Sequence, residues 1–300
     1  MANVVMNGRV VAFCNRKGGV GKTTSAVSVA DTLQSQFGKS VVLVDTDPQG
    51  SSSMALARDD MLRGGLASKF LERTLSGSSL DGRRIDLDAV VRRAVGRLTD
   101  RPETPMALVP ISPAFWKYEI KVRKEVAFFS TTRTVAVRRF RRLMGELRRE
   151  YDFTIIDTAP GVSMLFENIV RASDFLVIPC VPDPVSAWGL NLLSEELASM
   201  RGNPAPPARI LWTQFNPNSN WQDRIRQDLE PLPFPYFTRG NEAPGGEAQE
   251  ILGIGQYSGL PAAIANVEPR SWSALYSGPL GANLLRICED MLDVLDGASE

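Results

Sequence analysis

Short apolar runs, rich in β-branched residues, recur along the chain and are separated by longer segments with helical spacing. These runs lack polar alternation, which is typical of strands that are buried on both faces of a parallel sheet. Strands that alternate with helices predict βαβ crossovers, and therefore an α/β fold with a doubly wound, mostly parallel sheet flanked by helices. The predicted strands are 9–14, 41–45, 106–110, 153–157, 175–179 and 209–213.

The remaining segments are less regular. A helix is predicted from Gly21 to about Phe37, and leucines on one face predict another helix over 284–295. Residues 58–105 are polar, and we expect short helices there, above the edge of the sheet. Residues 231–281 carry many prolines and glycines and match no periodic pattern. Because neither a repeat nor a strong linker interrupts the chain, we predict a single domain over residues 1–300.

Composition excludes several kinds of chemistry. The 34 basic and 34 acidic residues balance, so any attraction to nucleic acid or membrane must come from a local patch. The chain has no histidine, and its three cysteines, Cys14, Cys180 and Cys288, lie far apart in apolar segments. Zinc sites, clusters held by paired cysteines and imidazole acid–base chemistry are therefore not expected. Without a signal peptide or an apolar run of about 20 residues, we expect a cytoplasmic protein.

The segment NRKGGVGKTT at 15–24 lies between the first predicted strand and the first predicted helix. Backbone N–H groups of a glycine-rich turn at a helix N-terminus bind phosphate, Lys22 would reach the β- and γ-phosphates, and the Thr23 hydroxyl would coordinate Mg²⁺. The spacing is unusual, because Arg16 stands where such loops have their first glycine and Lys17 is an extra lysine. The predicted nucleotide-binding residues of the loop are Gly18, Gly19, Val20, Gly21, Lys22, Thr23 and Thr24.

Three aspartates follow buried strands. Asp45 and Asp47 end the run VVLVDTD, and Asp157 ends the run FTIID. Because the carboxyl ends of parallel strands meet at one edge of the sheet, we expect these carboxylates beside the phosphate loop. Taken singly, each aspartate is also explained as the cap of the next turn.

The motifs KGGVGKTT at 17–24, DTDPQG at 45–50 and FTIIDTAPG at 153–161 resemble those of the ParA/MinD group of deviant Walker A ATPases, most closely the Soj-like ParA branch. The resemblance covers roughly residues 9–215. It implies a Mg²⁺-dependent ATPase with a slow basal rate. It also implies an ATP-dependent homodimer in which Lys17 of each subunit reaches the phosphates bound by the other.

The resemblance assigns roles to individual residues. The catalytic residues implied are Lys17, Lys22 and Asp47, with Asp47 orienting the attacking water. The residues implied for Mg²⁺ are Thr23, Asp45 and Asp157. Asn216 is the candidate for contact with adenine, although it is equally well explained as the start of a turn before Pro217.

Basic residues are concentrated between Lys121 and Arg149. Phe140, Leu143 and Leu147 follow helical spacing, so this segment predicts an amphipathic helix with an arginine-rich outer face. Such a face is either simply solvated or contacts DNA phosphates without sequence preference. The candidates for DNA contact are Arg138, Arg139, Arg142 and Arg224.

The resemblance favours a nucleoid-associated ATPase that positions plasmid, chromosome or protein cargo and is stimulated by a ParB-like or other adaptor. The chain begins about eight residues before the first strand, so we expect no operator-binding extension. A membrane-switching MinD-like ATPase is the less favoured alternative, because the C-terminal segment is acidic and anionic lipid would repel it. A metal-delivery ATPase or nitrogenase-type reductase lacks suitable cysteines. A metabolic ATPase of the same fold, such as an amidotransferase-linked synthetase, remains a further alternative.

Overall fold

The computed structural model describes residues 8–62, 71–75, 85–95, 98–100, 103, 106–112, 115–125, 131–161, 163, 165–200, 204–215, 232–238, 252–255 and 270–297. A seven-stranded sheet in the order β3-β2-β4-β1-β5-β6-β7 forms its centre, and all of its neighbouring strands run parallel. The strands are β1 Arg9–Phe13, β2 Val41–Asp45, β3 Ala107–Val109, β4 Phe153–Asp157, β5 Phe175–Cys180, β6 Ala208–Phe215 and β7 Gly253–Gly255.

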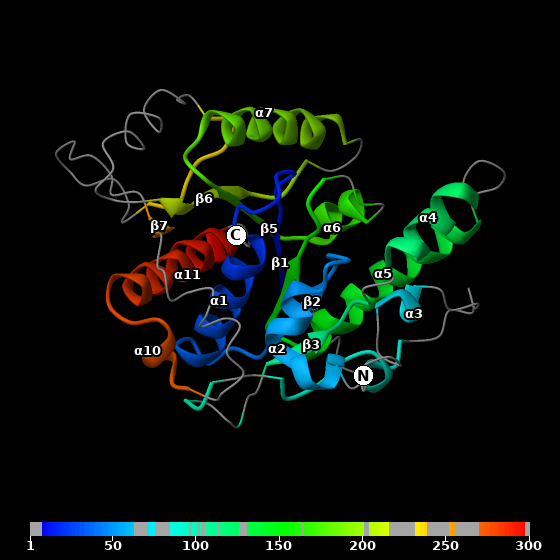
Figure 1. The fold of residues 1–300 in the computed structure, drawn as a ribbon, viewed down its shortest axis with the longest axis horizontal. Coiled ribbons are helices and arrows are strands. Elements are labelled where there is room, and N and C mark those ends of the chain that lie inside the picture. The colour runs from blue at the N-terminus through cyan, green and yellow to red at the C-terminus, as the bar shows by residue number, and fades with distance from the viewer. Residues whose placement is uncertain are drawn as a thin grey trace.

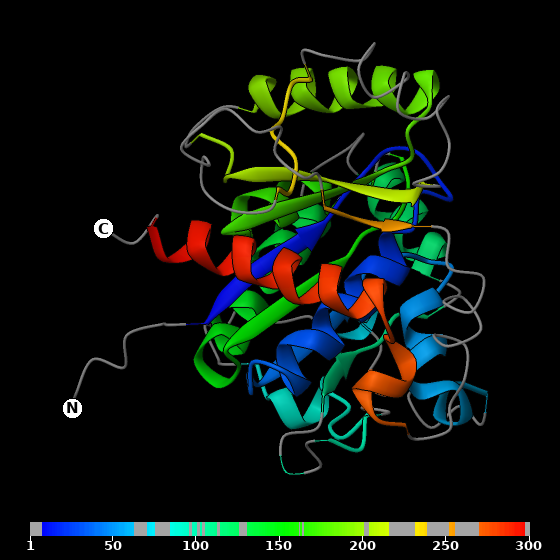
Figure 2. The same ribbon diagram turned by 90° about the vertical axis from the view of Figure 1, so that its left-hand side faces the viewer.

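Helices cover both faces of the sheet (Figure 1). The described helices are α1 Lys22–Ser35, α2 Ser51–Leu62, α3 Leu71–Leu75, the 3₁₀ helix η1 Leu87–Ala89, α4 Phe115–Glu125, α5 Thr131–Glu150, α6 Phe166–Ala172, α7 Pro184–Ser199, α10 Trp272–Leu275 and α11 Pro279–Gly297. α1 and α11 lie against one another on one face of the sheet (Figure 2). α5, α6 and α7 bury their apolar residues against the other face.

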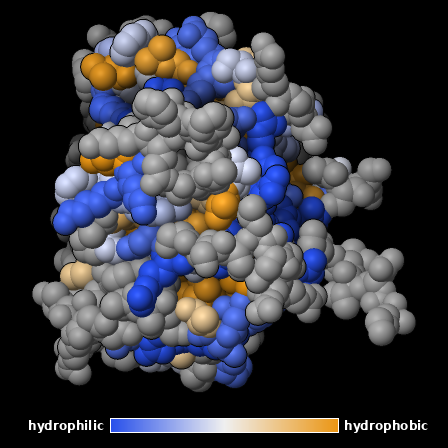
Figure 3. All heavy atoms as spheres, turned by 90° about the vertical axis from the view of Figure 1, so that its right-hand side faces the viewer, coloured by the Kyte–Doolittle hydropathy of each residue, from blue (hydrophilic) through white to orange (hydrophobic). Residues whose placement is uncertain are grey.

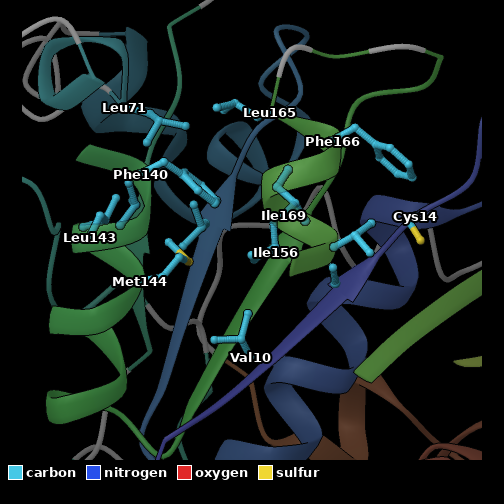
Figure 4. Close-up of a cluster of buried hydrophobic side chains, with 14 of the residues drawn as sticks. Val10, Cys14, Leu71, Phe140, Leu143, Met144, Ile156, Leu165, Phe166 and Ile169 are labelled. Atoms are coloured by element: carbon cyan, nitrogen blue, oxygen red, sulfur yellow. The ribbon is translucent and has the colours of Figure 1, made fainter. Parts of the chain in front are cut away.

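Residues of β1 alternate between two cores. Val11 and Phe13 pack on the side of α1 and α11, whereas Val10 and Ala12 pack on the side of α5 and α6. Figure 4 shows the second core, where Phe140 and other side chains of α5 lie opposite the strand carrying Val10. Because both faces of β1 are buried, Val10, Val11, Ala12 and Phe13 are all apolar, which explains the absence of polar alternation in this strand.

The predicted strands and the doubly wound α/β class are confirmed, with small changes at the ends. The strand predicted over 209–213 extends to Ala208–Phe215, and the helix predicted over 284–295 begins earlier, at Pro279. The amphipathic helix with Phe140 and Leu147 on its buried face is α5. Strand β7, within the unassigned segment 231–281, was missed. That residues 1–300 form a single domain stays a prediction.

Candidate nucleotide-binding site

The loop between β1 and α1 has the backbone of a phosphate cradle. Gly19 and Gly21 have φ angles of 74° and 81°, which favour glycine, and Gly21 is the N-cap of α1. Arg16 is not among the described non-glycine residues with positive φ, so its position does not require glycine. The loop borders a cavity of about 770 Å³. Its lining residues are Gly18, Gly19, Gly21, Lys22, Thr23, Thr24, Asp47, Gln49, Ser51, Met54, Ala55, Pro160 and Gln214.

Lys22, the first residue of α1, is buried, with 6% of its surface exposed. Its ammonium Nζ donates a hydrogen bond to the carbonyl oxygen of Lys17 at 2.8 Å. Burial lowers the pKa of Lys22, and the negative charges of Asp157 and Asp47 offset part of this effect. The sheet edge therefore holds a desolvated cation next to carboxylates, which is a suitable place for a polyphosphate with a divalent cation.

Asp157, at the end of β4, connects the sheet to the loop. Its Oδ2 accepts a hydrogen bond from Thr23 Oγ1 at 2.7 Å. Its Oδ1 is buried and makes no hydrogen bond of good geometry with the described residues. Burial and the charge of Asp45 raise the pKa of Asp157 to about 8, and hydrogen bonding from Thr23 and Ser52 opposes this only in part. A divalent cation near Oδ1 would relieve this unfavourable burial.

The donor set fits Mg²⁺ better than a metal held entirely by protein. Among the described residues no group of three or more His, Cys, Asp or Glu side chains is placed to hold a metal ion. Mg²⁺ keeps several waters and is usually bound by one or two protein groups together with substrate phosphates. Thr23 and Asp157 are the residues that suit this role.

The other two predicted acids lie at the same edge, since Asp45 pairs in register with Asp157. Asp45 is buried, and its Oδ2 accepts hydrogen bonds from the N–H and the hydroxyl of Ser53 at 2.8 and 2.6 Å. Its Oδ1 accepts from the N–H of Asp47 at 3.1 Å. Both oxygens are thus engaged, and Asp45 fixes the start of α2 and the position of Asp47. Direct metal contact by Asp45 stays a prediction.

Asp157→Asn is expected to make folding less sensitive to pH. The folded-state pKa of about 8 lies above the value of an unfolded aspartate, so native Asp157 keeps a proton that the unfolded chain releases. Stability of the wild type should therefore fall as pH rises toward 8. Asparagine does not titrate, so the stability of the variant should not fall over this pH range. The free energy of unfolding of Asp157→Asn relative to that of the wild type should therefore be roughly 1–3 kcal/mol greater at pH 8.5 than at pH 5. Urea unfolding of both proteins in EDTA at the two pH values measures it, and parallel pH profiles would contradict it.

The Lys17 side chain contacts the beginning of α7. Its Nζ lies 2.8 Å from Asp183 Oδ2 and 3.0 Å from Ser186 Oγ, at the beginning of α7. Arg16 pairs with Glu196 of the same helix at 2.7 Å. The two residues that make this loop unusual are therefore both bound to α7.

The structure adds contacts from β6 that the sequence pattern did not predict. Thr213 Oγ1 donates to the carbonyl oxygen of Val20 at 2.8 Å, and Gln214 Nε2 donates to that of Gly19 at 2.5 Å. Gln214 has a φ of 53°, which turns the chain at the end of the strand. The position of Gln214 at the carboxyl end of a predicted strand was the feature of the sequence that could have placed it beside the loop. Asn216 lies outside the described residues.

The candidate DNA-contact arginines differ in their surroundings. Arg138 is exposed and Arg142 is half-buried on α5. Arg139 Nε donates to the carbonyl oxygen of Thr74, so this side chain connects α5 to α3. Figure 3 views the molecule from the side of α4 and α5, where hydrophilic residues are prominent. Arg224 lies outside the described residues.

The first strand of the parallel sheet leads through a glycine-rich loop into a helix, and Thr23 of that helix contacts Asp157. This arrangement defines the class of phosphate-loop NTPases. The chain belongs to the AAA_31 family, an AAA domain, which it matches over residues 8–205. The predicted resemblance to ParA proteins is confirmed by its relatives.

Two relatives illustrate this. An uncharacterized protein of Mycobacterium tuberculosis is 31% identical over 214 residues, which cover 70% of this chain and 59% of the relative. The sporulation initiation inhibitor protein Soj of Bacillus subtilis is 29% identical over 186 residues, covering 62% of this chain and 63% of Soj. The chain thus matches less than two thirds of the length of either relative.

Solved structures share the fold. Apo McdA of Cyanthece has a TM-score of 0.69 at 16% identity, covering 94% of this chain and 99% of McdA. pNOB8 ParA bound to nonspecific DNA has a TM-score of 0.64 at 21% identity, covering 97% and 99%. Cobyrinic acid a,c-diamide synthase of Mycobacterium smegmatis, with an ATP analogue and magnesium, has a TM-score of 0.65 at 19% identity, covering 95% and 94%. The fold is therefore common to partitioning proteins and a biosynthetic enzyme.

Proposed function

We propose that this protein is a ParA-type, Mg²⁺-dependent ATPase that dimerises on binding ATP and then binds DNA without sequence preference. A ParB-like or other adaptor stimulates hydrolysis and releases the dimer, which positions plasmid, chromosome or protein cargo on the nucleoid. The observation that carries this proposal is the loop itself. It places Lys22 beside Asp157 and Asp47, while a second lysine, Lys17, extends from the same loop to its outer side at α7.

Each residue at the sheet edge has a defined task in this proposal. The N–H groups of the loop and Lys22 bind the phosphates. Thr23 and Asp157 hold Mg²⁺, which neutralises charge that develops on the phosphates. Asp47, whose backbone is fixed by Asp45, orients the attacking water. Lys17 reaches the phosphates of the partner subunit and makes association depend on nucleotide.

DNA binding is supported by the basic surface of α5 and by the family. Arg138 is exposed there, and a protein of the same fold has been solved on nonspecific DNA. Contacts with phosphate release counterions, so binding of this kind weakens steeply with salt. Dimerisation doubles the surface and raises affinity through avidity.

The two alternatives are less well supported. A MinD-like membrane switch would need the apolar face of the C-terminal helix, but α11 buries Leu284, Ile287 and Met291 in the core. Among the described residues no helix is long and apolar enough to cross a membrane. A biosynthetic role remains compatible with the fold, as the likeness to the diamide synthase indicates. A measurement of DNA binding distinguishes the biosynthetic role from the partitioning role.

Binding to a random-sequence DNA duplex should require ATP. We expect no binding with ADP, salt-sensitive binding with ATP, and the tightest binding for Asp47→Ala with ATP, because that variant retains the bound nucleotide. Reversing the charges of Arg138 and Arg142 to glutamate should weaken binding by roughly tenfold or more and flatten the salt dependence. Fluorescence anisotropy across a salt series measures both effects.

Lys39→Glu is a suitable control, because it reverses a charge just before β2, at the opposite edge of the sheet from the phosphate loop. It should leave the salt slope nearly unchanged. Absence of binding in every nucleotide state would overturn the partitioning proposal and favour a biosynthetic ATPase. An equal loss in all charge variants would instead contradict the assignment of Arg138 and Arg142.

A further inference from the structure

Asp183 binds Lys17 and starts α7 at the same time. Its Oδ1 accepts a hydrogen bond from the backbone N–H of Ser186 at 2.9 Å, which makes Asp183 the N-cap of the helix. Its Oδ2 lies 2.8 Å from Lys17 Nζ and also accepts from the Ser186 hydroxyl at 2.8 Å. One carboxylate therefore links the phosphate loop to the beginning of a helix on the same subunit.

The backbone beside Lys17 is fixed. The Lys17 N–H donates to Asn15 Oδ1 at 2.9 Å, and Asn15 Nδ2 donates to the carbonyl oxygen of Pro179 at 2.7 Å. The carbonyl oxygen of Arg16 accepts from the N–H of Gly161 at 3.0 Å. Any change in the place of the Lys17 ammonium must therefore come mainly from its side chain, which has to leave Asp183.

The ion pair is partly shielded from water, with side-chain exposures of 34% for Lys17 and 24% for Asp183. Although burial opposes ionisation, the hydrogen bonds from Lys17 and Ser186 keep the pKa of Asp183 below its usual value. Asp183 is therefore charged at neutral pH and attracts the Lys17 ammonium.

We infer that Asp183 is a positioning residue that holds Lys17 on its own subunit and competes with the reach of Lys17 to the partner's phosphates. This inference rests on the proposed ATP-dependent dimer. The ammonium cannot contact Asp183 of its own subunit and a phosphate of the other subunit at once. Each association event therefore breaks this ion pair twice, once in each subunit.

The expected change in the dimer dissociation constant follows from the loss of one ion pair in each subunit. A partly exposed ion pair changes an equilibrium by about two- to fivefold. Because two pairs break per dimer, neutralising Asp183 should tighten the dimer by roughly four- to twenty-five-fold. The direction of the effect is diagnostic, since damage to α7 would weaken association instead.

Asp183→Asn is the appropriate variant. Asparagine is as good an N-cap as aspartate, so α7 keeps its first turn while the negative charge is lost. Glu195→Gln is the matched control, because it removes one negative charge from an exposed position on the same helix. Sedimentation velocity with AMP-PNP and Mg²⁺ over a range of protein concentrations gives the dimer dissociation constant of each protein, at low and at high salt.

We expect the dissociation constant of Asp183→Asn to fall by the stated factor, the control to match the wild type, and the difference to shrink at high salt. Binding of AMP-PNP to the dilute monomer should be unchanged. If the wild type associates and Asp183→Asn associates equally or more weakly, the inference is wrong while the proposed dimer stands. If no protein associates with AMP-PNP, the proposed dimer fails and the inference with it.

Discussion

Lys22→Ala is expected to lose ATP binding by roughly 30-fold or more, because a buried cation that contacts phosphate contributes about 2–5 kcal/mol when it is truncated. Lys22 is buried at the start of α1, and the negative charges of Asp157 and Asp47 lie close enough to affect its pKa. Its removal also leaves the negative charge of Asp47 without a compensating cation. The site then repels a polyphosphate that it would otherwise attract.

Isothermal titration calorimetry with AMP-PNP and Mg²⁺ measures this loss. Lys39→Ala is the matched control, since it removes a lysine that lies apart from the lining of the cavity. Folding must be retained in both variants, as judged by their cooperative unfolding. Wild-type affinity of Lys22→Ala would show that this loop does not bind the phosphates.

The position of the site could be predicted because each of its parts is a short segment that the sequence pattern identifies by itself. The loop and the start of α1 are adjacent in sequence, and Asp45 and Asp157 each end a buried strand. Parallel strands place such ends at one edge, so the sequence was sufficient to bring these residues together. The apolar runs were equally informative, since β1 is covered on both faces.

Contacts between distant segments could not be predicted in this way. Lys17 and Asp183 are 166 residues apart, and Gln214 reaches Gly19 across 195 residues. Nothing in the local pattern of either segment specifies its partner, because these pairs depend on how the strands are ordered in the sheet. β7 was missed for another reason, as Gly253–Gly255 is too short and too rich in glycine to show strand periodicity.

The same limit applies to the interpretation of charged residues. The pattern groups Arg139 with Arg138 on a basic surface but does not reveal that Arg139 donates a hydrogen bond to the backbone of Thr74 in α3, and its contact with DNA stays a prediction. The hydrogen bonds of Asp45 with Ser53 and with the backbone N–H of Asp47 were likewise not predicted, and the role of Asp45 at the metal stays a prediction. The contacts of a charged side chain therefore have to be known before a function is assigned to it.

Lys17→Ala should abolish the ATP-dependent dimer while ATP binding by the monomer is retained. The loop N–H groups and Lys22 remain to bind the phosphates, whereas each dimer loses two ammonium–phosphate contacts. Hydrogen bonds to charged groups contribute about 1.5–3 kcal/mol each, so we expect the dimer dissociation constant to rise by roughly two to four orders of magnitude.

Sedimentation velocity with AMP-PNP measures the dimer, and calorimetry on the same samples measures nucleotide binding. Loss of both would mean that Lys17 acts within its own subunit, as part of the phosphate site. A dimer of wild-type stability would remove the role across the interface. Retained nucleotide binding without a dimer would assign the two lysines different tasks, with Lys22 serving its own subunit and Lys17, once released from Asp183, serving the other.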